Sequence, residues 1–241
     1  MTPNDSVERL AAALDLNCRD LLRKRRAAEG LPGYPPAFTV AISRDAGAGG
    51  TAIARAVGER LGWPVYDREL LQRVAEGMGL RPEQLEKVDE RHKGWLQQCL
   101  EFFVTSPPVA GDAYACRLAE ALLSLAARGE CVIVGRGAAQ VLPAESTLRV
   151  RLVGPFPARV RAVQRRHGAS AEEAERRVAA TDSEWRRFVQ EYFHKDPSDA
   201  GLYDLVLNSA RFTAGQCVDF IVEALQRFQE ARSAKQPAAV A

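Results

Sequence analysis

A strand, a glycine-rich loop, a helix and a second strand follow one another between residues 38 and 67. Residues 38–42 are apolar and rich in strand-forming side chains, which is typical of a parallel strand covered on both faces. The glycines lie in the loop at residues 43–51, and residues 65–67 indicate the second strand. The helix between them is indicated by apolar side chains at helical spacing: Ile53, Val57 and Leu61. This order predicts a βαβ unit, in which a helix connects two parallel strands.

The rest of the chain continues the alternation of strands and helices. Three further short apolar segments predict strands: residues 131–135, 148–153 and 205–208. Helical patterns separate and follow them: residues 68–128 for the most part, 157–167, 171 to about 193, and a closing helix around 218–225. Such alternation favours an α/β fold, with a parallel sheet, helices on both of its faces and right-handed crossovers. Ligands of these folds bind beyond the carboxyl ends of the strands.

Composition excludes several classes of protein. The 241 residues suit one large domain with extensions, and we expect residues 1–37 to form a helical extension and linker and residues 233–241 a flexible tail. The net charge of +2 offers no general attraction to nucleic acid or membrane. No apolar run reaches the ~18 residues of a membrane span. Five widely separated cysteines predict neither a disulfide framework nor a zinc site, so we expect reduced thiols and a cytoplasmic location.

Two phosphate-binding patterns compete for the glycine loop. The dinucleotide fingerprint G-x-G-x-x-G/A is met by Gly47, Gly49 and Ala52, and Asp67 stands where a ribose-binding acid would lie. The P-loop pattern G-x-x-x-x-G-K-[ST] is met only at Gly49 and Thr51. Its first glycine and its lysine are replaced, as the remaining two positions hold Arg44 and Gly50.

The surroundings of the loop favour the P-loop pattern. Residues 43–46 separate the strand from Gly47, whereas a dinucleotide turn begins almost at the end of its strand. The long helical stretch at residues 68–128 also departs from a dinucleotide-binding half, where the third strand follows a short helix. A glycine-rich turn without a ligand is the remaining alternative. If the loop does bind phosphate, its position makes Arg44 a candidate for the charge of the missing lysine.

Four sequence blocks resemble the cytidylate kinase-like family, a branch of the P-loop nucleoside-monophosphate kinases. They are residues 40–50, 66–71, 132–137 and 203–208, in the family's order, and the resemblance extends over about 38–228. A glycine loop without a lysine, Gly-x-Gly-Gly, is itself a feature of that family. The resemblance implies a three-layer P-loop NTPase fold over residues 38–232, with five parallel strands, helices on both faces and a helical lid at about 157–200.

The resemblance also implies roles for individual residues. The ATP phosphates would lie on the glycine loop, and Thr51 would approach the Mg²⁺ that accompanies ATP. Asp67 and Arg73 match the Asp-x5-Arg that opens the family's monophosphate-binding helix, so Asp67 belongs to the expected monophosphate site. Arg73 and Arg136 would hold the acceptor phosphate, because a guanidinium group can bind two phosphate oxygens at once. The expected ATP-phosphate site is Arg44, Gly47, Ala48, Gly49, Gly50 and Thr51.

Arginines of the lid would neutralise the phosphoryl group during transfer. The two lid helices carry eight arginines interleaved with glutamates, so we expect two or three to act and the rest to form a solvated face: Arg159, Arg161, Arg165, Arg166, Arg176, Arg177, Arg186 and Arg187. Asp182 resembles the lid aspartate of the family. Relatives often carry an arginine where Trp185 stands, which leaves Arg186 as the substitute. We expect Arg136, Arg165 and Arg186 to be the catalytic arginines.

These expectations describe an ATP-dependent phosphotransferase that acts on CMP, dCMP or a related small phosphate acceptor. Val134 and Gly137 replace acids of the cytidylate kinases, so the base of the acceptor stays open. The expected partners are ATP and a nucleoside monophosphate, with no nucleic acid or membrane and an unknown oligomeric state. Two alternatives remain: a non-catalytic or regulatory nucleotide-binding P-loop protein, which Gly50 favours, and an NAD-binding oxidoreductase, which the literal fingerprint favours.

Overall fold

The computed structural model describes residues 38–67, 118, 121–123, 125–126, 128–193 and 195–233. The predicted extension at 1–37, the segment at 68–117 that contains Arg73, and the tail beyond residue 233 lie outside the described residues. Among the helices of the described part, none combines the length and apolar character needed to cross a bilayer.

Five parallel strands form one sheet in the order β2-β3-β1-β4-β5. They are β1 (Thr39–Arg44), β2 (Val65–Tyr66), β3 (Cys131–Val134), β4 (Thr147–Val153) and β5 (Leu205–Asn208). Each lies on a segment that the sequence predicts as a strand, with small shifts at the ends. Ile42 pairs with Val134 of β3 and with Val150 of β4. The carboxyl ends of these three strands therefore reach the same edge of the sheet.

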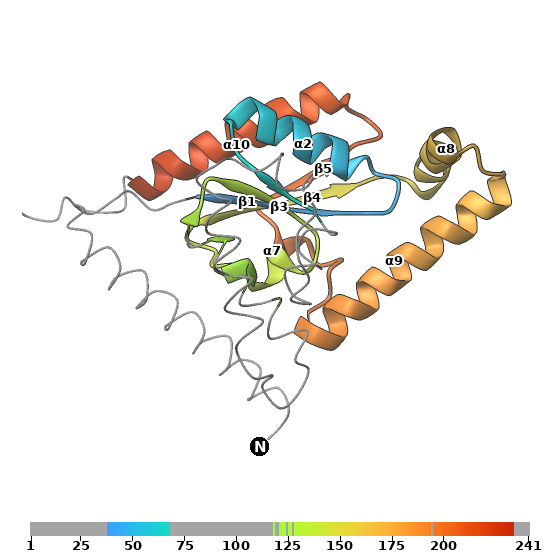
Figure 1. Cartoon of the computed structure of the whole chain (residues 1–241), viewed down its shortest axis with the longest axis horizontal. Helices are drawn as coiled ribbons and strands as arrows, with labels where there is room; N and C mark the ends of the chain where they lie inside the picture. The colour runs from blue at the N-terminus through green and yellow to red at the C-terminus, as the bar shows by residue number, and fades with distance from the viewer. Residues whose placement is uncertain are drawn as a thin grey trace, which may run out of the picture.

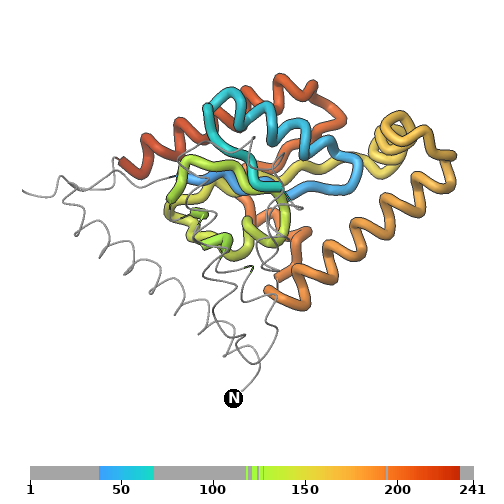
Figure 2. The backbone as a smooth tube through the Cα atoms, viewed as in Figure 1, coloured from blue at the N-terminus to red at the C-terminus, as the bar shows by residue number. Residues whose placement is uncertain are grey.

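Helices cover both faces of the sheet, which confirms the three-layer α/β fold (Figure 1). One face carries α2 (Gly50–Leu61) and α10 (Ala214–Ser233), which pack against each other. The other face carries α7 (Ala138–Val141) and helical residues between 118 and 128. After β4 the chain runs outward through α8 (Phe156–His167) and returns along α9 (Ala171–Phe193) towards α7, as the tube of Figure 2 shows. A 3-10 helix, η1 (Ala200–Leu202), precedes β5.

The core divides between the two faces because successive strand residues point to opposite sides of the sheet. Val40 and Ile42 of β1 pack with the apolar sides of α2 and α10, whereas Ala41 packs on the other face with Tyr66 and Leu122. All five side chains are 0–1% exposed. The sheet is therefore buried on both faces over β1 and β3, and this rigid framework fixes the loops at its carboxyl edge.

Burial also sets the reactivity of the two described cysteines. Burial raises the pKa of the Cys131 thiol to about 12, and the pKa of the Cys217 thiol is raised for the same reason. Because the thiolate is the nucleophile, we expect both cysteines of the folded protein to resist iodoacetamide at pH 8 and to be alkylated once the chain is unfolded. Peptide-resolved mass spectrometry measures this, and native labelling of Cys131 at the rate of a free thiol would contradict the burial.

Candidate functional site

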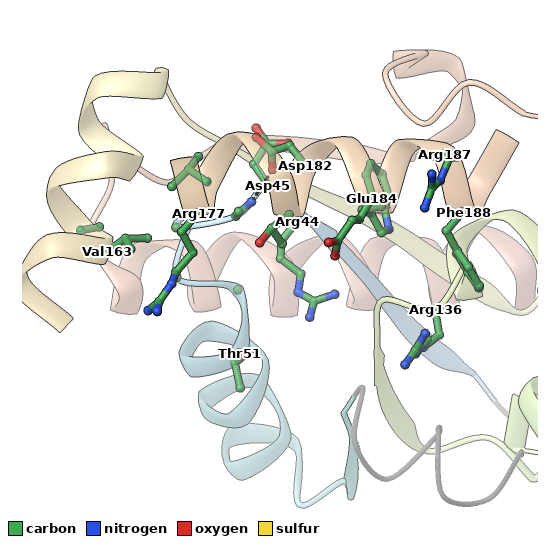
Figure 3. Close-up of a pocket in the computed structure, with 18 of the residues that line it drawn as sticks. Arg44, Asp45, Thr51, Arg136, Val163, Arg177, Asp182, Glu184, Arg187 and Phe188 are labelled. Carbon is green, nitrogen blue, oxygen red and sulfur yellow. Dashed lines mark hydrogen bonds between the residues drawn. The ribbon is translucent and has the colours of Figure 1, made fainter. Parts of the chain in front are cut away.

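A cavity of about 600 Å³ opens at the carboxyl edge of the sheet. The glycine loop and the start of α2 form one side, Arg136 after β3 forms another, and α8 and α9 form the rest (Figure 3). Most of the expected ATP-phosphate site lines this cavity: Arg44, Gly47, Gly49, Gly50 and Thr51. Ala48 is instead buried in the core beneath the loop, at 5% exposure.

The loop suits an anion because its glycines leave the start of α2 open. Gly49 is the N-cap of α2 and has a positive φ of 72°, and no side chain of the described residues caps this helix end with a hydrogen bond. A helix N-terminus carries roughly half a positive charge on its N–H groups. The end of α2 therefore offers the cavity both backbone donors and a favourable dipole.

The glycine loop packs more tightly against neighbouring backbone at Gly47 than at Gly49. Both residues have positive φ, 81° and 72°, but a Cβ at Gly47 would lie 2.6 Å from the carbonyl oxygen of Arg159, whereas a Cβ at Gly49 would meet nothing within 4 Å. The loop thus lies directly against the first turn of α8.

This difference makes Gly49→Ala a matched control for Gly47→Ala. Each substitution places an alanine in the left-handed region, at about 1–2 kcal/mol, but only Gly47→Ala must also displace backbone. We expect Gly47→Ala to lower the free energy of unfolding by about 1–3 kcal/mol more than Gly49→Ala. Urea denaturation followed by circular dichroism measures both, and equal losses would count against the close contact.

Arg136 reaches the cavity from a left-handed turn. Gly135, Arg136 and Gly137 have φ of 76°, 51° and 73°, and a positive φ is uncommon for a residue other than glycine. The Arg136 side chain points into the cavity from the end of β3 (Figure 3), and its guanidinium carbon lies 5.8 Å from the centre of the Phe188 ring. The turn thus presents this cation opposite the glycine loop.

A group of four charged residues, here called the loop–lid cluster, joins the glycine loop to α8 and α9, the helices of the expected lid. Its members are Asp45, Arg151, Arg159 and Asp182. Arg151 Nη2 donates to Asp45 Oδ1 at 2.6 Å and Arg159 Nη1 to Asp182 Oδ2 at 2.6 Å. Arg159 Nε also lies 3.8 Å from Asp45 Oδ2. Their side chains are only 10–21% exposed.

The loop–lid cluster also holds the loop backbone. Asp182 Oδ1 accepts a hydrogen bond from the Ala46 N–H at 2.8 Å, and Arg159 Nη1 donates to the Ala46 carbonyl oxygen at 3.0 Å. Asp182 of α9 therefore binds the backbone of the glycine loop itself, and Arg159 anchors the first turn of α8 to it. Neither contact could be read from sequence, because the partners lie far apart along the chain.

Different lid arginines line the cavity from those that the sequence analysis favours. Arg166, Arg177 and Arg187 line it. Arg165 is exposed on α8 and belongs to neither of the two cavities described here, and Arg186 lines a second cavity of about 280 Å³ on another side of α9. Successive residues of a helix differ by about 100° in direction, so an offset of one residue selects another face.

The spacing of apolar residues in α9 could have shown from the sequence which arginines of this helix face the cavity. Its partly or fully buried side chains recur at intervals of three or four residues and mark the inner face: Val178, Thr181, Trp185, Phe188 and Tyr192. Arg186 lies off this face, near Asp196, whose pKa is lowered first by hydrogen bonds from Ser198 and further by the charge of Arg186. Arg177 and Arg187 are each next to a residue of the inner face and lie at the margins of the cavity.

The structure separates Asp67 from the glycine loop. Asp67 follows the edge strand β2 and lies 3.8 Å from Arg55, and it is not among the residues that line the cavity. β3 lies between β2 and β1, whereas the dinucleotide fingerprint requires the second strand beside the first. The strand order is therefore that of a P-loop fold, and it excludes the geometry on which an NAD site would depend.

Comparisons with known proteins agree with this geometry. The model of the Cytidylate kinase-like family matches residues 39–211. The chain is 29% identical over 194 residues to a cytidylate kinase of Methanopyrus kandleri, covering 76% of this chain and 91% of that protein. It is 26% identical over 177 residues to a cytidylate kinase of Pyrococcus horikoshii, covering 73% and 82%.

A solved structure shares the fold. An uncharacterized protein from Eubacterium ventriosum superposes with a TM-score of 0.61 at 20% identity, over 78% of this chain and 98% of its own. The family model runs from the start of β1 to the turn after β5 and so includes the glycine loop, Arg136 and the lid helices. On that match, this chain belongs to the cytidylate kinase-like family.

Proposed function

We propose that this chain is an ATP-dependent nucleoside-monophosphate kinase, which transfers the γ-phosphoryl group of ATP to CMP, dCMP or a related small phosphate acceptor. The observation that supports the proposal is that two groups suited to bind phosphate line one cavity. The glycine loop and the α2 N-terminus form the first, and Arg136 forms the second across from them. A protein that only bound ATP would need no second phosphate-binding group such as Arg136.

The cavity suits the reaction in size. Its volume of about 600 Å³ lies within the usual range for ligand sites. In the proposed reaction an oxygen of the acceptor phosphate attacks the γ-phosphorus, the bond from that phosphorus to the β–γ bridging oxygen breaks, and ADP leaves with that oxygen. Such transfer depends on positioning and on positive charge around the γ-phosphoryl oxygens.

Named side chains divide this work. The loop N–H groups would hold the ATP phosphates and Arg136 the acceptor phosphate. Because they line the cavity, Arg166, Arg177 and Arg187 are the lid arginines that we propose to act on the γ-phosphoryl group, in place of Arg165 and Arg186. Arg73 stays a proposed acceptor-phosphate residue, as it lies outside the described residues.

A Mg²⁺ ion that accompanies ATP fits the residues present. Within the described part of the chain, no three His, Cys, Asp or Glu side chains gather as a metal site of their own. Mg²⁺ usually keeps several waters and binds through one or two protein groups and the substrate phosphates. The Thr51 hydroxyl at the start of α2 is the group that would hold it, and the ion would supply positive charge to the phosphates.

Val134 does not select the base of the acceptor. Its side chain is 0% exposed and packs in the core with Val132 and Val150. The base would therefore be recognised by other residues. Comparing turnover of several nucleoside monophosphates identifies the preferred base.

Release of ADP by the purified full chain with ATP, Mg²⁺ and CMP, dCMP, UMP or AMP, measured in a coupled assay, tests the proposal. We expect turnover with at least one of these monophosphates. Saturable ATP binding without turnover on any of them would overturn the kinase and favour the non-catalytic nucleotide-binding protein.

A further inference from the structure

The Arg44 side chain occupies the space beside position 50, where a P-loop carries its lysine. A Cβ added to Gly50 would lie 2.6 Å from Arg44 Cγ and 2.8 Å from Arg44 Cβ. A Cβ added to Gly135 would collide with Arg44 Nη1. Arg44 therefore leaves the end of β1, passes over the first residue of α2, and ends beside the turn that carries Arg136.

Both glycines are thus matched to this arginine. A lysine at position 50 and the observed Arg44 side chain exclude each other, because their first carbon atoms would overlap. The guanidinium of Arg44 points into the cavity in the region between Thr51 and Arg136 (Figure 3). It lies between the proposed donor-phosphate and acceptor-phosphate sites.

We propose that Arg44 is the phosphate-binding cation of the loop and does from its first position what a lysine at position 50 does in other P-loops. A guanidinium presents two parallel N–H donors to phosphate oxygens, whereas an ammonium is a point charge. Arg44 would hold oxygens of the ATP β- and γ-phosphates while the γ-phosphoryl group moves. Its part in transfer rests on the proposed kinase function, but its part in ATP binding does not.

The sequence of the loop describes an exchange of two residues. The P-loop pattern has glycine first and lysine seventh, and this loop has Arg44 and Gly50 at those positions, with Gly49 and Thr51 retained. The double substitution Arg44→Gly/Gly50→Lys therefore restores the full pattern in this chain. It moves one positive charge from one position to the other and leaves the net charge unchanged.

Five proteins test the exchange: the wild type, Arg44→Met, Gly50→Lys, Arg44→Gly/Gly50→Lys, and the control Arg60→Met. Arg60 lies on α2 in an exposed pair with Asp219, so its loss should leave ATP binding unchanged. Arg44→Met keeps much of the length of the side chain and removes its charge. We expect kcat to fall by a factor of about 10²–10³, as for the loss of one preorganised donor. We expect ATP affinity to fall and adenosine affinity to hold.

Gly50→Lys alone should also lose ATP affinity, because the two side chains compete for one space. The double substitution should exceed Gly50→Lys in both ATP affinity and turnover by at least about tenfold, as contacting residues couple strongly. Wild-type ATP affinity in Arg44→Met would overturn the proposal. So would a folded double variant, judged by circular dichroism, that is no better than Gly50→Lys.

The two proposals fail in different ways. If the wild type turns over no monophosphate, the proposed kinase function fails, while calorimetric ATP and adenosine affinities of Arg44→Met still decide the role of Arg44 in binding. If the wild type is active and Arg44→Met is equally active, the kinase stands and the assignment of Arg44 fails.

Discussion

Replacing Arg151 with methionine is expected to lower the free energy of unfolding by about 3–5 kcal/mol. The Arg151 side chain is 10% exposed and is the nearest cation to Asp45, at 2.6 Å. It also donates to Ser43 Oγ at 2.9 Å, and its guanidinium carbon lies 4.4 Å from the centre of the Trp185 ring. Methionine fills a similar volume without a charge, so the remaining ion-pair partner of the largely buried Asp45 among the described residues would be the more distant Arg159, at 3.8 Å.

The same substitution at an exposed ion pair provides the control. Arg60 lies 3.2 Å from Asp219, and both side chains are more than half exposed, at 57% and 60%. Exposed pairs contribute about 0–1 kcal/mol, so Arg60→Met should change stability little. Urea denaturation monitored by far-ultraviolet circular dichroism measures both variants and avoids the fluorescence of Trp185. Equal losses would contradict a buried, coupled cluster.

A double-mutant cycle separates the pair from general packing. Asp45→Asn removes the charge that Arg151 neutralises, so the combined variant should lose less stability than the sum of the two single variants. Additive losses would mean that Arg151 acts through packing on Trp185 and not through Asp45.

Replacing Arg136 with alanine is expected to weaken binding of the acceptor monophosphate about 10- to 100-fold, the range for lost hydrogen bonds to a charged group. Arg136 faces the glycine loop across the cavity, so ATP affinity should change little. Arg136→Lys should restore only part of the loss, because an ammonium lacks the paired donors of the guanidinium. KM for the monophosphate and ATP affinity by calorimetry distinguish the two sites.

The backbone of Arg136 supplies a further control. Its φ of 51° suits glycine better than alanine, so Arg136→Gly should be at least as stable as Arg136→Ala while binding the acceptor as weakly. Losses of ATP and monophosphate affinity by the same factor in either variant would contradict an acceptor-phosphate role.

The sequence predicted the sheet well because a parallel strand buried on both faces is a continuous apolar run, as in Cys131–Val134. The long helix α9 was predicted for a similar reason, since its buried residues keep one phase over many turns. α7 was not predicted, because a helix of four residues after a glycine turn is too short to show a period.

The parts of the candidate site that directly follow a strand could be predicted from the sequence. The glycine loop and Arg136 follow β1 and β3, which are neighbours in the sheet, so their meeting follows from the topology. The loop–lid cluster was not predictable, because Arg151 stands in a strand pattern that also suits an exposed charge. Its burial depends on α9, which packs over it through Trp185 from far along the chain.

The contact between Gly47 and the Arg159 carbonyl oxygen couples two parts of the molecule energetically. There is no room for even a Cβ between Gly47 and the Arg159 carbonyl oxygen, so we expect a ligand that moves the loop to shift the first turn of α8 as well. Thermodynamic linkage is reciprocal. If nucleotide binding favours a shift of α8 by some factor, then an event that shifts α8 in the same way raises nucleotide affinity by that same factor. Under the proposed function, a substitution on the outer surface of α8 that shifts its first turn is therefore expected to change nucleotide affinity, even though it alters no residue of the proposed phosphate site.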